Sequence, residues 1–218
     1  PQGAKNAPAE LHRRKQRQFA AFNPKELAYM FDDTILGSDL GGHLELVRRF
    51  LHSCRVNKTI LKPKKVHIAR SRVKHQGFIM RHGVYEKDPV AVQPLVDMPM
   101  PKNASELRSQ MSMIGHYRRF IAHYAQLAAP LEAIMSARWG PDTWRSHHEV
   151  SMTALRRELA KSTMLTMPNW NLPMVWRVDS GPTTGIAAVV GQMDKEGQFY
   201  PIRFLAKKAS DADRRRWP

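Results

Sequence analysis

The stretch Tyr29-Met30-Phe31-Asp32-Asp33-Thr34-Ile35-Leu36 places two adjacent carboxylates between apolar residues. An apolar run of this length is typical of a strand, in which neighbouring side chains point to opposite faces. An acidic pair in the middle of a strand is costly to bury, so we expect Asp32 and Asp33 to lie at the turn of a β-hairpin. The turn can be merely structural, or its carboxylates can bind a hard divalent cation such as Mg²⁺. Spacing alone favours the structural interpretation.

The composition of the chain is strongly basic. There are 35 Lys and Arg against 19 Asp and Glu, which gives a formal net charge of +16 and a pI near 10.4. Such an excess attracts polyanions, and nucleic acid is the expected partner because each neutralised phosphate releases a counterion. A membrane surface and a merely soluble basic protein are the weaker alternatives.

Other features of the sequence disfavour several classes of protein. No apolar run approaches the roughly 20 residues that span a bilayer, and the first residues lack a signal-peptide pattern, so we expect an intracellular protein without a membrane partner. The lone Cys54 argues against an internal disulfide framework and against a cysteine-based zinc site. Because the sequence begins at Pro1 rather than Met, we expect a fragment or a processed piece of a longer chain.

Hydrophobic periodicity predicts an α+β chain. Helices are expected within residues 1–23 and at 39–56, 103–135 and 147–161, the third with a break at Pro130 and an apolar face of Leu107, Met111, Ile114, Tyr117 and Ile121. We also expect short strands at 60–61 and 66–68, a hairpin from 73–80 to 84–85, and a proline-punctuated linker at 89–101. Strands at 174–179, 185–191 and 199–204 predict a β-meander, so a domain boundary is placed near 165–172.

Motifs in register along the whole chain resemble one family. They are Pro1-Gln2-Gly3, Met30-Phe31-Asp32-Asp33, Lys62-Pro63-Lys64-Lys65, Pro101-Lys102-Asn103, Tyr117-Arg118-Arg119-Phe120-Ile121, Ala128-Ala129-Pro130-Leu131, and Val178-Asp179 followed by Gly185 to Gln192. In this order they resemble a gypsy-type LTR-retrotransposon Pol polyprotein, from within its reverse transcriptase into its ribonuclease H. The resemblance implies a partial palm with the acidic hairpin at 1–90, a helical thumb and connection at 91–168, and a truncated ribonuclease H-like β-meander at 169–218.

The resemblance also implies site residues and partners. Asp32, Asp33 and Asp179 are the expected catalytic and metal-binding carboxylates, holding Mg²⁺ or Mn²⁺ only if a full-length chain supplies the missing acids. RNA and DNA are the expected partners, as a template–primer and an RNA–DNA hybrid, with protein or RNA partners in an assembly as a further expectation. The expected contacts to nucleic acid or nucleotide are Gln2, Gly3, Arg13, Arg14, Lys62, Lys64, Lys65, Gly77, Arg118 and Arg119. Trp139 and Trp144 are either base-stacking residues or core residues.

Some residues depart from the family pattern. Met30 replaces an aromatic residue, Thr34 and Lys15 stand at apolar positions, and Ser180 follows Asp179 where alanine is usual. A buried Lys15 without a partner would be costly, so we expect the first helix to face solvent, a polyanion or a partner chain. Two hypotheses follow. The chain is a fragment of an RNA-directed DNA polymerase with ribonuclease H that is inactive by itself, or it is a domesticated or decayed remnant that binds RNA or serves as a structural subunit.

Overall fold

A computed structural model describes residues 6–181 and 185–210. The chain divides into two compact units, Pro1–Arg70 and Ser71–Pro218. This division falls within the segment that the sequence assigns to the palm, while the domain boundaries at 90/91 and 168/169 stay predictions. In the part of the chain that the structure describes, every helix is too short or too polar to cross a membrane.

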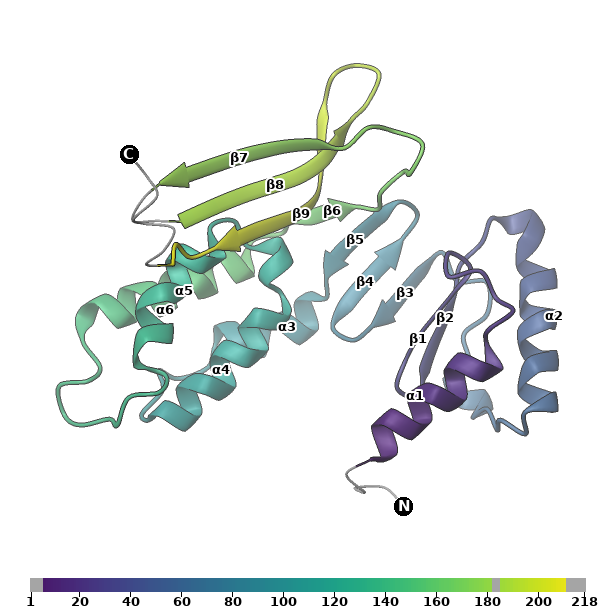
Figure 1. Cartoon of the computed structure of the whole chain (residues 1–218), viewed down its shortest axis with the longest axis horizontal. Coiled ribbons are helices and arrows are strands. Elements are labelled where there is room, and N and C mark those ends of the chain that lie inside the picture. The colour runs from purple at the N-terminus through teal and green to yellow at the C-terminus, as the bar shows by residue number, and fades with distance from the viewer. Residues whose placement is uncertain (1–5, 182–184, 211–218) are drawn as a thin grey trace. The chain divides into compact units, whose positions relative to one another are not determined.

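The described part of the first unit combines two α-helices with one hairpin (Figure 1). Its elements are α1 (Ala7–Gln18), β1 (Leu27–Met30), β2 (Asp33–Leu36), α2 (Leu40–Val56) and the 3₁₀ turn η1 (Pro63–Lys65). The Asp39 side chain caps α2 by accepting a hydrogen bond from the Gly42 amide. The ring of Phe19, just after α1, stacks on Phe50 of α2 at 5.7 Å and contacts Tyr29 of β1 at 5.6 Å. These rings join both helices to the hairpin.

The strands predicted at 60–61 and 66–68 are absent from the described structure of this unit. Pro63 instead begins η1, where its fixed φ and missing N–H are tolerated. Ile60 is 93% exposed, so no sheet covers it. The β1–β2 hairpin itself is confirmed: the strands are antiparallel, Met30 pairs with Asp33, and Phe31 and Asp32 lie between them.

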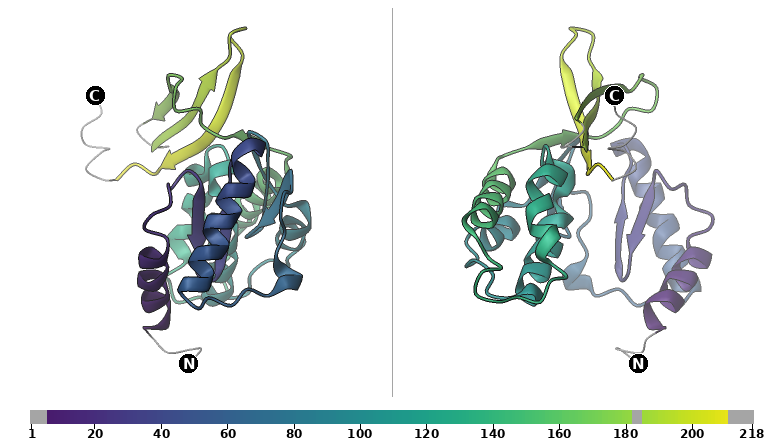
Figure 2. Two further views of the ribbon diagram at one scale, coloured as in Figure 1. Left: turned by 90° about the vertical axis from the view of Figure 1, so that its right-hand side faces the viewer. Right: turned by 60° about the vertical axis from the view of Figure 1, so that its left-hand side comes forward.

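The described residues of the second unit form two antiparallel sheets and four α-helices (Figures 1 and 2). Strands β3 (Arg72–His75), β4 (Phe78–Arg81), β5 (Val84–Lys87) and β6 (Met164–Thr166) form one sheet, and β7 (Val175–Gly181), β8 (Gly185–Met193) and β9 (Phe199–Lys207) form the other. The helices are α3 (Pro89–Val96), α4 (Ala104–His116), α5 (Tyr124–Ile134) and α6 (Ser146–Ala160), with the 3₁₀ turn η2 (Arg118–Phe120) before α5. The mixed helix–sheet fold and the C-terminal meander agree with the sequence predictions.

The main core lies between the four-stranded sheet and the helices. Phe78 of β4, Tyr85 of β5 and Leu165 of β6 turn one face of the sheet toward it. The apolar residues predicted from the sequence are buried, each at most 5% exposed: Leu107, Met111, Ile114, Tyr117 and Ile121. Burying these side chains contributes about 1.5–3 kcal/mol each. The continuous helix expected from 103 to the break at Pro130 is wrong, because α4 ends at His116, with Tyr117 as its C-cap, and Ile121 follows η2.

Three further local predictions in this unit need correction. The strand expected at 73–80 is interrupted by a turn at Gln76 and Gly77, both with positive φ. The linker expected at 89–101 contains α3, because the Asp88 side chain caps it by accepting a hydrogen bond from Val90 N and Pro89 suits its first turn. Pro130 lies inside α5 rather than starting a helix.

Candidate active site and nucleic-acid interface

The acidic turn joins two short strands whose register places Met30 opposite Asp33. Both aspartates are exposed, as are Met30 and Phe31. Phe31 adopts a left-handed backbone conformation with φ of +50°, which is uncommon for a bulky residue and is often found at functional turns. Asp32 therefore lies in the turn, as the sequence predicts, whereas Asp33 is the first residue of β2 beside it.

Lys15 of α1 lies against this hairpin. Its ammonium donates to the Asp33 carbonyl oxygen at 3.3 Å and to Thr34 Oγ1 at 3.2 Å, and the side chain is buried. Burial lowers the pKa of Lys15, while the charges of Asp32 and Asp33 act to raise it. Lys15 is thus buried with partners, because the hairpin supplies the oxygen acceptors that a buried ammonium needs. Most of the other described residues of α1 are exposed, which agrees with a helix that faces solvent.

A divalent cation fits the acidic turn only in part. Mg²⁺ prefers six oxygen ligands in octahedral geometry, and the two adjacent aspartates can supply carboxylate oxygens. Across the described residues, however, no group of three or more His, Cys, Asp or Glu side chains is placed to hold a metal ion. Asp179 lies in the other unit, exposed in β7 and paired with Ala187 of β8. The acidic pair and Asp179 therefore belong to different compact units, and their roles as ligands of two separate metal sites stay predictions.

The predicted basic contacts of the first unit lie in separate places. Gln2 and Gly3 fall outside the described residues. Arg13 forms an exposed ion pair with Glu10, and Arg14 donates to the Asn57 carbonyl oxygen at 3.1 Å. The remaining three contacts are exposed at or beside η1: Lys62, Lys64 and Lys65. The structure thus leaves the basic run open to solvent but gives Arg14 a structural partner.

The predicted contacts of the second unit have mixed roles. Arg119 lies over the rings of Phe78 and Tyr85, at 5.9 and 5.6 Å, so its guanidinium packs on the sheet. Arg118 lines a groove of about 480 Å³ together with Tyr124 of α5 and Trp176 of β7. These positions agree with the prediction that the arginine pair lies outside the apolar face of the helix.

Gly77 and the two predicted tryptophans have structural roles. A Cβ at Gly77 would collide with the Tyr117 hydroxyl, and the φ of Gly77 is +79°, so only glycine fits this turn without strain. Trp139 donates from Nε1 to the Ile134 carbonyl oxygen at 3.0 Å, and its ring lies 5.7 Å from that of Trp144. Both tryptophans pack against the core, which supports the core interpretation over base stacking.

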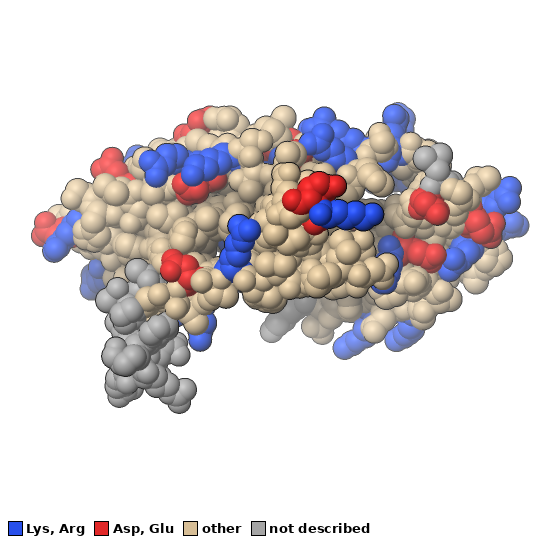
Figure 3. Space-filling view, turned by 90° about the horizontal axis from the view of Figure 1, so that it is seen from above, with Lys and Arg blue, Asp and Glu red and all other residues tan. Residues whose placement is uncertain are grey.

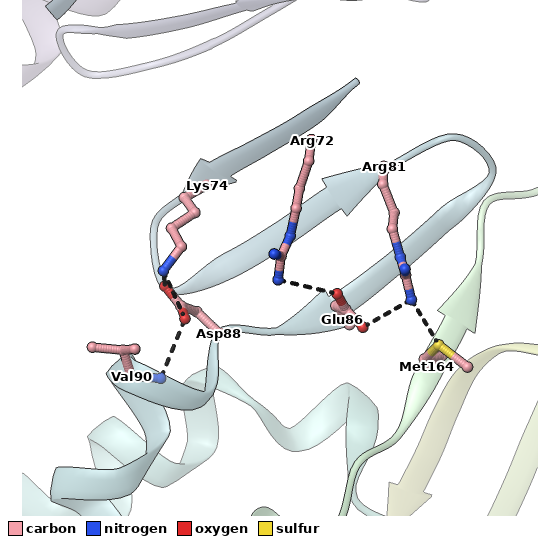
Figure 4. Close-up of polar contacts among 7 residues, drawn as sticks. All are labelled: Arg72, Lys74, Arg81, Glu86, Asp88, Val90 and Met164. Carbon is pink, nitrogen blue, oxygen red and sulfur yellow. Dashed lines mark hydrogen bonds and ion pairs between the residues drawn. The ribbon is translucent and has the colours of Figure 1, made fainter. Parts of the chain in front are cut away.

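A basic face on the four-stranded sheet was missed by sequence reasoning (Figure 4). Arg72 of β3 pairs across the strands with Arg81 of β4, and both guanidinium groups contact Glu86 of β5, at 3.8 and 3.4 Å. Lys74 forms a 2.9 Å ion pair with Asp88, which also caps α3. Each of the three cations is about half exposed: Arg72, Lys74 and Arg81.

The sequence signal for this basic face is the alternation of Arg72 and Lys74, which puts both on one side of a strand. The contribution of Arg81 becomes visible only when the turn at Gly77 fixes the cross-strand register. On the face drawn in Figure 3, Lys and Arg are interspersed with Asp and Glu.

These features define a class of protein: a mixed helix–sheet chain with an acidic hairpin, a helical core and a C-terminal meander. Residues 144–217 match the RNase H-like domain found in reverse transcriptase. This match begins before the predicted start of the ribonuclease H segment and includes α6.

Relatives of the chain include Pol polyproteins of retroviruses and transposons. It is 26% identical to the Gag-Pol polyprotein of baboon endogenous virus (strain M7) over 95% of its length, which is 12% of that protein. Two further relatives are Pol polyproteins of Drosophila melanogaster transposons. The chain is 24% identical to that of transposon 297, over 97% of the chain and 20% of that protein. It is 26% identical to that of transposon opus, over 98% of the chain and 22% of that protein. The predicted resemblance is confirmed, and the chain spans at most about a fifth of these relatives.

Solved structures show the same fold. A foamy viral protease-reverse transcriptase in complex with RNA/DNA hybrid matches with a TM-score of 0.76 and 18% identity, over 98% of this chain and 29% of that one. A second form, in complex with double-stranded DNA, matches with a TM-score of 0.79 and 19% identity, over 98% and 37%. The fold is therefore shared along nearly the whole chain.

Proposed function

We propose that this chain is a segment of a retroelement RNA-directed DNA polymerase with ribonuclease H. The observation that carries the proposal is the fold, which follows foamy viral reverse transcriptases over 98% of the chain. In this assignment residues 1–90 belong to the palm, 91–168 to the thumb and connection, and 169–218 to the ribonuclease H segment. Mg²⁺ or Mn²⁺, when bound, activates the primer hydroxyl and stabilises the leaving pyrophosphate.

The residues of this chain supply part of that chemistry. Asp32 is the direct carboxylate ligand, in the turn of the β1–β2 hairpin, and Asp33 is the secondary one, at the start of β2. Asp179 is the first carboxylate of the site that cleaves the RNA strand of a hybrid. Each set requires further acids from the longer chain, because two adjacent carboxylates cannot alone fix a cation at catalytic geometry.

The polymerase assignment is tested by Asp32→Asn in the longer polyprotein. Primer extension on an RNA template, dependent on Mg²⁺, should fall by about a hundredfold or more, since the reacting centre is deprived of a charged metal ligand. Asp142→Asn, at an exposed loop aspartate, is the matched control and should extend normally. Equal extension by the Asp32→Asn protein would contradict the assignment.

We also propose that the chain holds its nucleic-acid substrate on basic surfaces. The foamy viral structures are complexes with RNA/DNA hybrid and with double-stranded DNA, and the basic face offers three partly exposed cations. Glu86 and Asp88 hold these side chains in place, which reduces the entropic cost of binding phosphates.

The combined change Arg72→Gln, Lys74→Gln and Arg81→Gln tests this surface. Binding of an RNA–DNA hybrid, measured by fluorescence anisotropy over a range of salt concentrations, should weaken about tenfold or more. The salt slope should fall by about 1 for each phosphate that the variant no longer neutralises. Arg157→Gln, on the exposed side of α6, is the control. An unchanged salt slope would overturn the proposal.

A decayed or domesticated remnant that binds RNA or acts as a structural subunit is the second candidate. The polar pair of Lys15 and Thr34 beneath the acidic turn favours it, because a fixed cation competes with a metal ion. Hybrid binding that depends on salt, together with extension unaffected by Asp32→Asn, supports this candidate over the polymerase.

A further inference from the structure

The Lys15 side chain connects α1 to the acidic hairpin. It is 7% exposed, and its ammonium contacts three parts of the hairpin: the Asp33 carbonyl oxygen at 3.3 Å, Thr34 Oγ1 at 3.2 Å and the Tyr29 ring at 5.9 Å. These groups come from both strands, on either side of the turn. A cation so placed fixes where the turn lies relative to α1.

Thr34 is the natural partner of this ammonium. It is half-buried and follows the aspartate pair directly. A partly buried hydroxyl deprived of its partner costs about 1–3 kcal/mol, and a buried ammonium without acceptors costs more. Each of the two polar side chains therefore offsets the cost of burying the other. The losses of stability caused by changing Lys15 and Thr34 should be strongly non-additive.

The same ammonium lies beside the main chain of the aspartate pair, since it contacts the Asp33 carbonyl oxygen and the Thr34 hydroxyl. A positive charge at this position attracts the carboxylates of Asp32 and Asp33. The interaction works in both directions: a cation that stabilises the two carboxylates also repels a second cation that approaches them. Burial of the lysine keeps that charge in place and limits its screening by salt.

We propose that Lys15 is a positioning residue that fixes the acidic turn through Thr34 and the Asp33 main chain, and that its charge weakens the affinity of the turn for a divalent cation. The positioning role does not depend on the polymerase assignment. The second role rests on the proposed function only in taking the turn as the cation site.

The experiment combines a double-mutant cycle with metal titration on the full chain. The variants are Lys15→Met, Thr34→Val, the double variant and Lys15→Arg, with Lys25→Met as the control because Lys25 is an exposed lysine of the same unit. Thermal unfolding should show that both single variants lower the Tm. The double variant should unfold well above the Tm that adding the two single shifts gives, since it replaces the polar pair with an apolar contact.

Mn²⁺ binding, followed by the electron paramagnetic resonance signal of the free ion, tests the second role. Lys15→Met and the double variant should bind Mn²⁺ about three- to tenfold more tightly than the wild type. Lys15→Arg and Lys25→Met should match the wild type. Adding Asp32→Asn to Lys15→Met should abolish the gain, which assigns it to the turn.

Two results would overturn the inference. Additive Tm shifts would show that Lys15 and Thr34 act independently. An Mn²⁺ affinity of Lys15→Met equal to that of the wild type would remove the electrostatic role. Neither readout involves nucleotide transfer, so a failed primer-extension assay leaves this inference standing, and failure here leaves the polymerase assignment standing.

Discussion

Two lysines, Lys15 and Lys87, are buried, and their ammonium groups have different surroundings. Lys15 finds oxygen acceptors on the hairpin. Lys87, at the end of β5, is equally buried, but its Nζ has no hydrogen-bond partner among the described residues and lies over the Phe120 ring at 5.5 Å. Burial lowers the pKa of Lys87 to about 8, against an opposing effect from the Glu158 charge. Lys87 therefore reduces stability at neutral pH.

Lys87→Met should raise the free energy of unfolding at pH 7 by about 1–2 kcal/mol, because the apolar side chain keeps the packing on Phe120 and removes the buried charge. Between pH 8 and the ordinary lysine pKa of 10.5, the unfolded chain still holds a proton that folded Lys87 has released. The wild type thus gains stability as the pH rises through this window, and its deficit relative to Lys87→Met should shrink. Urea unfolding at pH 7 and pH 10 measures both effects.

The control for this prediction is Lys102→Met at an exposed lysine, which should change neither stability nor its pH dependence. A Lys87→Met protein that is less stable than the wild type at pH 7 would show that the ring contact outweighs the cost of burying the charge.

At the residue scale, the sequence shows that Lys15 and Thr34 are unusual at their positions, but it does not show that their side chains contact each other. Lys15 and Thr34 were both visible as polar residues at apolar positions, yet they are 19 positions apart and meet only through the fold. The positive φ of Gly77 was likewise unpredictable, because the Tyr117 hydroxyl that excludes a Cβ comes from another element. Local sequence patterns identify such residues, but the contacts that explain them form only in the folded chain.

At the scale of elements, one guanidinium joins α6 to α4 and to the segment between α3 and α4. Arg156 donates to the carbonyl oxygens of Met98 and Pro99 and to Gln110 Oε1, and Gln110 donates in turn to the Pro99 carbonyl oxygen. Burial lowers the pKa of Arg156. The planar fork of arginine suits several acceptors at once, which an ammonium cannot match.

Arg156→Met should lower the free energy of unfolding by about 2–4 kcal/mol, because it leaves the Met98 carbonyl oxygen and Gln110 Oε1 without this donor. Arg156→Lys should recover only part of the difference. Arg157→Met, at the exposed neighbouring position, is the matched control and should stay within about 0.5 kcal/mol of the wild type. Chemical denaturation of the four proteins compares them directly, and equal effects at 156 and 157 would contradict the bridging role.

Long periodic elements were predictable, and short or proline-containing ones were not. Helices α2, α4 and α6 follow from apolar spacing that persists over several turns. Helix α3 was predicted to be a linker because its prolines are typical of loops, although Asp88 is a good N-cap residue. A single strand was predicted over 73–80, although the chain turns at Gln76 and Gly77, because no local sequence pattern indicated the turn.

At the scale of the whole molecule, the sequence predicts one part of the candidate site, the acidic hairpin, but not the basic face. The acidic turn was predicted and found as a hairpin. The basic face was missed because it depends on the register between β3 and β4. Asp32 and Asp179 lie in different compact units, so their metal-binding roles rest on the resemblance rather than on neighbouring acids in the described structure.

The division at Arg70 predicts that residues 71–218 fold without the first unit. All members of the main hydrophobic core lie within this segment, and so do both larger sheets. A fragment of this size can bury enough apolar surface to be stable. In the smaller first unit, the buried side chains among those that the structure describes are few: Lys15, Phe19, Leu27, Leu46 and Cys54. We therefore expect the fragment 71–218 to unfold cooperatively and the fragment 1–70 to be marginally stable.

Circular dichroism melts and amide NMR spectra of the two fragments measure this difference. The isolated 71–218 fragment should also bind RNA–DNA hybrid through the basic face, and the combined change at Arg72, Lys74 and Arg81 should reduce that binding as it does in the full chain. A fragment that folds but binds no hybrid would assign the affinity to the first unit, where the exposed basic run at 62–65 lies. A fragment that does not fold would show that the main core requires the first unit, against the division of the chain at Arg70.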